Sequence, residues 1–116
     1  MKMRISNPAQ SYMQNRIDTA SPQQLMIMLY DGAIKFTSLA RQALERKDLA
    51  ESNKNLQRSQ LIVQELMVGL DISAGGEVAD NLFHIYEYIH YCLIQANISK
   101  NPEKLVAVIG HLTDLK

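Results

Sequence analysis

The sequence predicts an all-α protein, an antiparallel four-helix bundle preceded by a short N-terminal arm or cap helix. Three observations lead to this prediction. Apolar residues recur with a helical period after residue 20, two prolines each follow a residue that can cap a helix, and no stretch alternates as a strand does. The 116 residues suit a single domain, with residues 1–20 as the arm and residues 21–116 as the bundle.

The helix starts are marked by N-cap residues. Ser21 precedes Pro22, which suits the first position of a helix, and Asn101 precedes Pro102 in the same way. Asp48 is expected to cap a second helix so close to the first that the two fold back as a hairpin. The expected helices run from 22 to 47, from 49 to about 70, from about 77 to 99, and from 102 onward, with a break at residues 71–76 before the third.

Each of the three longer helices has an apolar stripe that is expected to face the core. The stripes are Leu25, Leu29, Gly32, Phe36, Ala40 and Ala43; Leu49, Leu56, Val63, Met67 and Leu70; and Val78, Leu82, Ile85, Ile89, Cys92 and Ala96. Other apolar residues lie well away from these stripes: Ile27, Tyr30 and Ile34; Leu61 and Val68; and Tyr91, Ile94 and Ile98. A bundle needs only one apolar face per helix, so these second faces are covered either by other parts of the chain or by a partner. The residues leave both explanations open.

Composition excludes several function classes. Twelve basic residues balance twelve acidic ones, whereas nucleic-acid binding needs a concentrated positive face. The single cysteine, Cys92, excludes an internal disulfide and suits a reducing compartment. No segment is long and apolar enough to insert into a membrane, and the start lacks the apolar core of a secretory signal. We therefore expect a cytoplasmic protein.

No catalytic or metal-binding arrangement is predicted. Glu87 and His90 have the spacing of ligands in di-iron bundles, but such a site needs a second pair and two further carboxylates. Both residues also project away from the core stripe of their helix. Cys92 falls on that stripe, where an apolar environment makes a thiol unreactive. We expect no cofactor, no metal and no enzymatic activity.

Several short motifs, in order along nearly the whole chain, resemble one family. They are Thr19-Ala20-Ser21-Pro22, Leu29-Tyr30-Asp31-Gly32-Ala33, Glu65-Leu66, Leu70-Asp71, Gly75-Gly76-Glu77, Asn81-Leu82, Tyr86 and Ala96-Asn97. Together they resemble the flagellin-specific export chaperones, the FliS family. The family usually continues its last helix further and has a tryptophan there, whereas this sequence ends at Lys116 without one. Contacts that the family makes through this last part of the helix are therefore not expected from the residues of this sequence.

The resemblance implies a cytoplasmic export chaperone that binds the disordered C-terminal segment of flagellin in outer apolar grooves and prevents premature polymerisation. It also implies that the N-terminal arm lies over part of this surface, with Ile5 and Tyr12 matching its apolar residues by position. On this reading, the flagellin segment and the arm cover the second apolar faces. The flagellar export apparatus is a further partner to consider. The alternative from another class is a structural bundle without a client, whose second faces bury each other in a homodimer.

Overall fold

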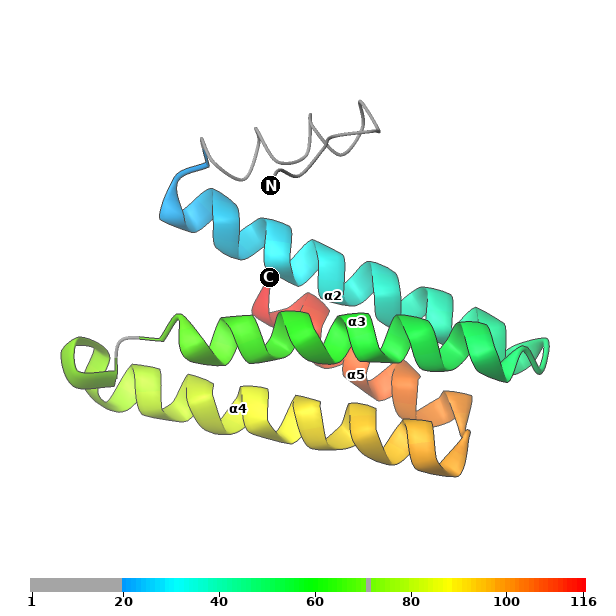
Figure 1. The fold of residues 1–116 in the computed structure, drawn as a ribbon. Coiled ribbons are helices and arrows are strands. Elements are labelled where there is room, and N and C mark those ends of the chain that lie inside the picture. Colours follow the sequence, from blue (N-terminus) through cyan, green and yellow to red (C-terminus); the bar gives the residue numbers. More distant parts are fainter. Residues whose placement is uncertain (1–19, 71) are drawn as a thin grey trace, which may run out of the picture.

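The computed structural model describes residues 20–70 and 72–116, with the backbone alone for residues 72–74. In this part the chain forms four helices: α2 (Pro22–Glu45), α3 (Leu49–Val68), α4 (Ile72–Ser99) and α5 (Pro102–Leu115). Successive helices run in opposite directions and pack side by side, and α5 returns to pack against α2 (Figure 1). The predicted all-α four-helix bundle is confirmed. The arm that was expected before it lies outside the described residues, apart from Ala20.

The helix starts follow the predicted caps. The Ser21 hydroxyl accepts a hydrogen bond from the Gln24 backbone N–H at 3.1 Å, and the Gln24 side chain returns one to the Ser21 N–H at 2.9 Å. The Asp48 and Asn101 side chains cap α3 and α5 by accepting hydrogen bonds from the backbone N–H groups of Glu51 and Glu103. The break expected over residues 71–76 is shorter than predicted, because α4 already begins at Ile72. It is confined to a kink inside α4, where Gly76 has a φ of 59° and a ψ of −132° that suit glycine alone.

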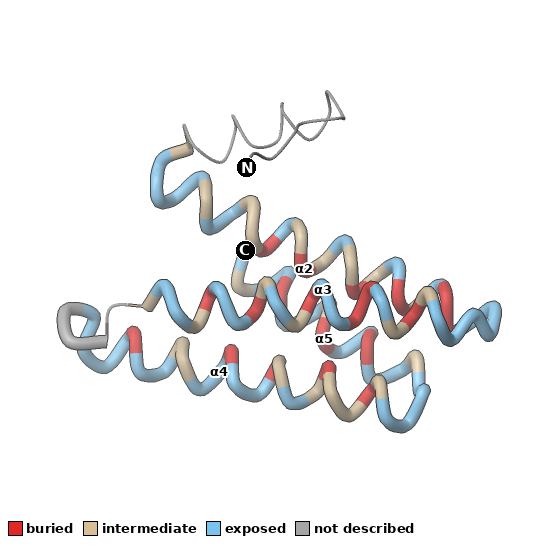
Figure 2. The backbone as a smooth tube through the Cα atoms, viewed as in Figure 1, coloured by how far each residue is buried: buried red, intermediate tan, exposed pale blue. Residues whose placement is uncertain are grey.

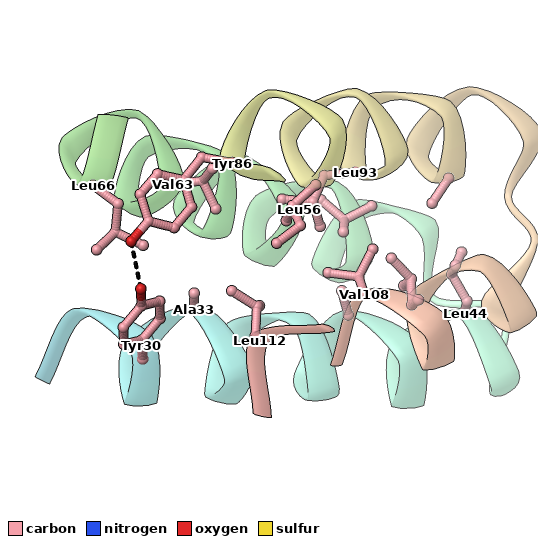
Figure 3. Packing of buried hydrophobic residues seen from close by; sticks show 14 residues of the cluster. Tyr30, Ala33, Leu44, Leu56, Val63, Leu66, Tyr86, Leu93, Val108 and Leu112 are labelled. Carbon is pink, nitrogen blue, oxygen red and sulfur yellow. Dashed lines mark hydrogen bonds between the residues drawn. The ribbon is translucent and has the colours of Figure 1, made fainter. Parts of the chain in front are cut away.

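Figure 2 marks the buried positions along the backbone, and their side chains form a line along the centre of the bundle (Figure 3). This core consists of Tyr30, Ala33, Ala40, Leu44, Leu56, Val63, Leu66, Tyr86, Ile89, Leu93, Ala96, Leu105, Val108 and Leu112. Leu56, Val63, Ile89, Ala40 and Ala96 were predicted for it. Two predicted stripes, however, are displaced around their helices.

On α2, the buried row is Tyr30, Thr37 and Leu44, one residue beyond the predicted row of Leu29, Phe36 and Ala43. Of these three predicted residues only Ala43 is buried, while Leu29 and Phe36 are partly exposed. Placing Tyr30 on an outer face was therefore wrong. A buried hydroxyl is tolerated because it has a partner: the Tyr30 hydroxyl is hydrogen-bonded to that of Tyr86, across the core from α4 (Figure 3).

The same offset occurs on α4. The prediction buried Val78, Ile85 and Cys92, but Val78 and Ile85 are exposed and Cys92 is half-buried. The row one residue further on, Ala79, Tyr86 and Leu93, is buried instead. Both rows are apolar and both have the spacing of seven, so periodicity alone does not choose between them.

Small and hydroxylated residues let α2 and α3 approach closely. The Thr37 and Ser59 hydroxyls are hydrogen-bonded to each other at 2.8 Å, and the Ser59 hydroxyl also donates to the Ala33 carbonyl at 3.3 Å. A Cβ atom on Gly32 would lie 3.1 Å from Cδ1 of Ile62. This tight hairpin forms one half of the bundle, and α4 and α5 complete it.

Candidate functional site

The outer side of α3 carries two apolar residues with nothing packed over most of their surface. Leu61 is 62% exposed and Val68 is 80% exposed. They are seven residues apart, so they lie almost in line along the helix, two turns from each other. Their predicted position away from the core is confirmed. Two large apolar side chains exposed on one line are unusual for a surface that contacts only water.

The outer side of α4 has a corresponding ridge. Tyr91 is 58% exposed and Ile98 is 70% exposed, again seven residues apart. Ile94, one turn from each, is half-buried. The ridge predicted from the spacing of these three residues is therefore present, with Ile94 at its inner margin.

The two ridges belong to one surface because α3 and α4 are antiparallel neighbours (Figure 1). Two side-chain hydrogen bonds set their register. The Gln64 amide nitrogen and the His90 ring lie 3.2 Å apart, and the Asn97 amide donates to the Asn53 side-chain oxygen at 2.8 Å. This register places Leu61 at the level of Tyr91. Both side chains point away from the buried rows of their helices, so they face the same outer side of the α3–α4 pair.

We call this region the α3–α4 surface, and its apolar members are Leu61, Val68, Phe83, Tyr91, Ile94 and Ile98. At one end it is hollowed by about 370 Å³, where Gln64, Met67, Val68 and Phe83 form the walls. Phe83 was not among the predicted site residues. The sequence contains a signal for it, because Phe83 lies seven residues before His90 and three after Asp80. This spacing puts Phe83 on the same flank of α4 as His90, the flank that faces α3.

The α2 candidates do not join this surface. Ile27 is exposed, whereas Ile34 is half-buried and packs against the core, so it is less open than the sequence indicated. Between them, Asp31 forms an ion pair with Lys116 at 2.6 Å, which ties the end of α5 to this side of α2. Tyr30 is only 4% exposed and belongs to the core. Ile5 and Tyr12 lie outside the described residues.

A second hollow, of about 440 Å³, lies between α4 and α5 and was not predicted. Its walls are His84, Ile85, Tyr88, His111, Asp114 and Leu115. The Tyr88 and His111 rings meet edge to face with their centroids 5.9 Å apart. The neighbouring Cys92 side chain, by hydrogen bonding, raises the pKa of Tyr88. No sequence signal pointed here, because the hollow depends on how α5 is placed against α4.

The described residues expose apolar side chains along α3 and α4. Across residues 20–70 and 72–116, no group of three or more His, Cys, Asp and Glu residues is placed to bind a metal ion. His90, considered above as a di-iron ligand, is bonded to Gln64 instead. Among the helices described, none is long and apolar enough to cross a membrane. A small helical bundle with apolar ridges on its outside defines a class, the proteins that bind another polypeptide on a helical face.

Comparison with known proteins gives the family. Residues 5–116 match the family model described as "Flagellar protein FliS", and this chain belongs to the FliS family. A relative from Bacillus subtilis, "Flagellar secretion chaperone FliS", is 40% identical over 114 residues, which cover 98% of this chain and 84% of the relative.

Two further relatives have the same name. The protein from Salmonella typhimurium is 35% identical over 108 residues, covering 92% of this chain and 80% of the relative. The protein from Campylobacter jejuni is 34% identical over 100 residues, which cover 86% of this chain and 78% of the relative. The predicted family is confirmed, and its relatives are named as secretion chaperones.

Proposed function

We propose that this protein is a cytoplasmic flagellar export chaperone that binds the disordered C-terminal segment of flagellin and prevents its premature polymerisation. It acts by binding and not by catalysis. The α3–α4 surface receives an amphipathic helix of the client, and Ile27 and the arm residues Ile5 and Tyr12 extend the contact. The complex is then delivered to the flagellar export apparatus.

The observation that carries this proposal is the exposure of four apolar residues on two adjacent helices, Leu61, Val68, Tyr91 and Ile98. An amphipathic helix buries its apolar side by lying along such a surface. A tyrosine suits the edge of this contact, because its ring packs against apolar groups while its hydroxyl stays in water. The name of the relatives, flagellar secretion chaperone, supports the same function.

The mode of binding limits the affinity. A disordered segment loses conformational freedom when it folds on the bundle, and this cost offsets part of the free energy gained from apolar burial. Binding is therefore expected to be reversible, as a chaperone that must release its client requires.

The test is to place a charge in the middle of the α3–α4 surface. Leu61→Asp should weaken binding of the flagellin C-terminal segment at least about tenfold, or about 1.4 kcal/mol, because a carboxylate is poorly solvated in an apolar contact. Leu61 is mostly exposed in the free protein, so the thermal unfolding temperature should change little. Isothermal titration calorimetry measures the affinity, and circular dichroism measures the unfolding.

Leu39→Asp is the matched control, because Leu39 is an exposed leucine on α2 and does not belong to the α3–α4 surface. It should leave the affinity unchanged. Unaltered binding by Leu61→Asp would exclude this surface. The homodimer alternative has its own outcome: light scattering would show that the free protein is a dimer, that Leu61→Asp makes it a monomer, and that flagellin does not bind to either.

A further inference from the structure

The α3–α4 surface has positive charge at one end. Lys54 lies seven residues before Leu61, so it continues the exposed ridge of α3. Beside it, the Lys100 ammonium donates a hydrogen bond to the Asn97 side-chain oxygen at 2.9 Å, and Asn97 in turn donates to Asn53 at 2.8 Å. This chain of hydrogen bonds crosses from α4 to α3 next to Lys54. Two ammonium groups are thereby placed at the end of the surface where Ile98 lies.

The opposite end is acidic. Asp80 and Glu87 are exposed, lie seven residues apart and share the row of α4 that leads to Ile94. They flank Phe83, which borders the hollow together with Val68 of α3. His84 lies between the two carboxylates, at 3.7 Å from Asp80 and 3.4 Å from Glu87.

Between these ends lie the apolar residues Leu61, Tyr91 and Ile94. Two exposed charges flank Leu61 in the same order, with Arg58 toward Lys54 and Glu65 toward the acidic end. From Lys54 to Val68 the surface is roughly 20 Å long, which corresponds to a helix of about 14 residues. None of the ion pairs among the described residues includes Lys54 or Lys100. The basic end is therefore available to charges on a partner.

We propose that the α3–α4 surface selects its client by the order of charges along the bound helix. The helix that fits has acidic side chains beside Lys54 and Lys100, an apolar stripe over Leu61 and Tyr91, and basic side chains beside Asp80 and Glu87. A helix laid down in the reverse direction brings like charges together at both ends, which disfavours it. This inference rests on the proposed function, since it specifies the orientation and sequence pattern of the same client.

The decisive variant inverts the order of charges without changing the net charge. It combines Lys54→Glu and Lys100→Glu with Asp80→Lys and Glu87→Lys. Its affinity for the flagellin C-terminal segment should fall at least about tenfold at 0.01 M salt, where charges interact over about 30 Å. At 1 M salt this range shrinks to about 3 Å, and the loss should shrink to less than about twofold. Unchanged or tighter binding at low salt overturns the proposal.

The lysine pair provides a matched control. Lys54→Glu with Lys100→Glu changes the net charge by the same amount as Lys35→Glu with Lys104→Glu, whose positions are exposed on α2 and α5. Only the first pair should weaken binding more than about threefold at low salt. Equal effects of the two pairs would mean that overall charge, and not its position, governs the affinity, which also overturns the proposal. Circular dichroism establishes that each variant is folded. If the variant with four substitutions does not fold, the two lysine-pair variants still test the proposal.

The Leu61→Asp variant separates this inference from the proposed function. If Leu61→Asp weakens flagellin binding and the charge-inverted variant binds as tightly as the wild type, the client binds to this surface but the order of its charges does not affect the affinity. If neither variant changes the affinity, the α3–α4 surface is not the client site and both proposals fail.

Discussion

At the residue scale, the contact between Tyr30 and Tyr86 is central to the packing of this bundle. Their hydroxyls are hydrogen-bonded across the core, and their rings are tilted at 52° with centroids 6.3 Å apart (Figure 3). Burial, and then the hydrogen bond with Tyr30, raises the pKa of Tyr86 well above that of a tyrosine in water. The contact joins α2 to α4, which are diagonal partners in the bundle.

Removing one hydroxyl of this pair should destabilise the protein. Tyr86→Phe leaves the Tyr30 hydroxyl buried without its partner, so the free energy of unfolding should fall by about 1–2 kcal/mol. The double variant with Tyr30→Phe should lose less than the sum of the two single losses, because no hydroxyl is then left unpaired. Urea denaturation monitored by circular dichroism measures each value. Additive losses would show that the two hydroxyls do not interact.

At the scale of the elements, the α2–α3 turn shows how closely the hairpin is closed. The Asp48 N–H donates to the Ala43 carbonyl at 2.8 Å, and the Lys47 N–H donates to the Leu44 carbonyl at 3.0 Å. This is the Schellman pattern, in which glycine usually occupies the position of Lys47. Lys47 has a φ of 64°, in the left-handed region that a side chain disfavours.

Replacing this lysine by glycine should stabilise the hairpin. Lys47→Gly removes the steric cost of the left-handed conformation, and a gain of about 0.5–1 kcal/mol in the free energy of unfolding is expected after the entropic cost of glycine. Arg46→Gly is the neighbouring control, because Arg46 has a φ of −97° and gains nothing from glycine. It should be neutral or destabilising in the same urea titration. A loss of stability in Lys47→Gly equal to that in Arg46→Gly would contradict this account.

At the scale of the whole molecule, the apolar ridges lie on the adjacent helices α3 and α4. On the rest of the bundle, α2 packs against α3 and α5 packs against α4 (Figure 1). A client on the α3–α4 surface contacts helix faces without entering the core. The fold can therefore stay unchanged while the client is bound and released.

Hydrogen exchange of the complete chain tests this arrangement. Adding the flagellin segment should slow exchange of the amides in residues 87–98 of α4 and 61–68 of α3, because binding stabilises these outer helices against local opening. Amides in residues 37–44 of α2, next to the core, should change little. Mass spectrometry of peptic fragments measures all three regions. Slowing confined to α2 would place the client on the opposite side of the bundle.

The sequence by itself determined the number of helices, the starts of α2, α3 and α5, and the outward position of Leu61 and Val68 on α3 and of Tyr91 and Ile98 on α4. These features depend on local chemistry. A capping side chain such as Ser21 or Asp48 bonds to a backbone N–H three residues away, and the helical period relates Leu61 to Val68 without reference to the rest of the molecule. The family was also recognisable from motifs along the chain.

The tertiary structure decided which of two adjacent apolar rows is buried and which helix faces combine into one surface. Periodicity gives the angles between side chains on one helix, but the rotation of that helix about its own axis depends on its neighbours. On α2 and α4 this rotation buries Tyr30 and Tyr86, because each hydroxyl finds its partner on the other helix. The same packing brings Leu61 level with Tyr91, which neither helix specifies alone.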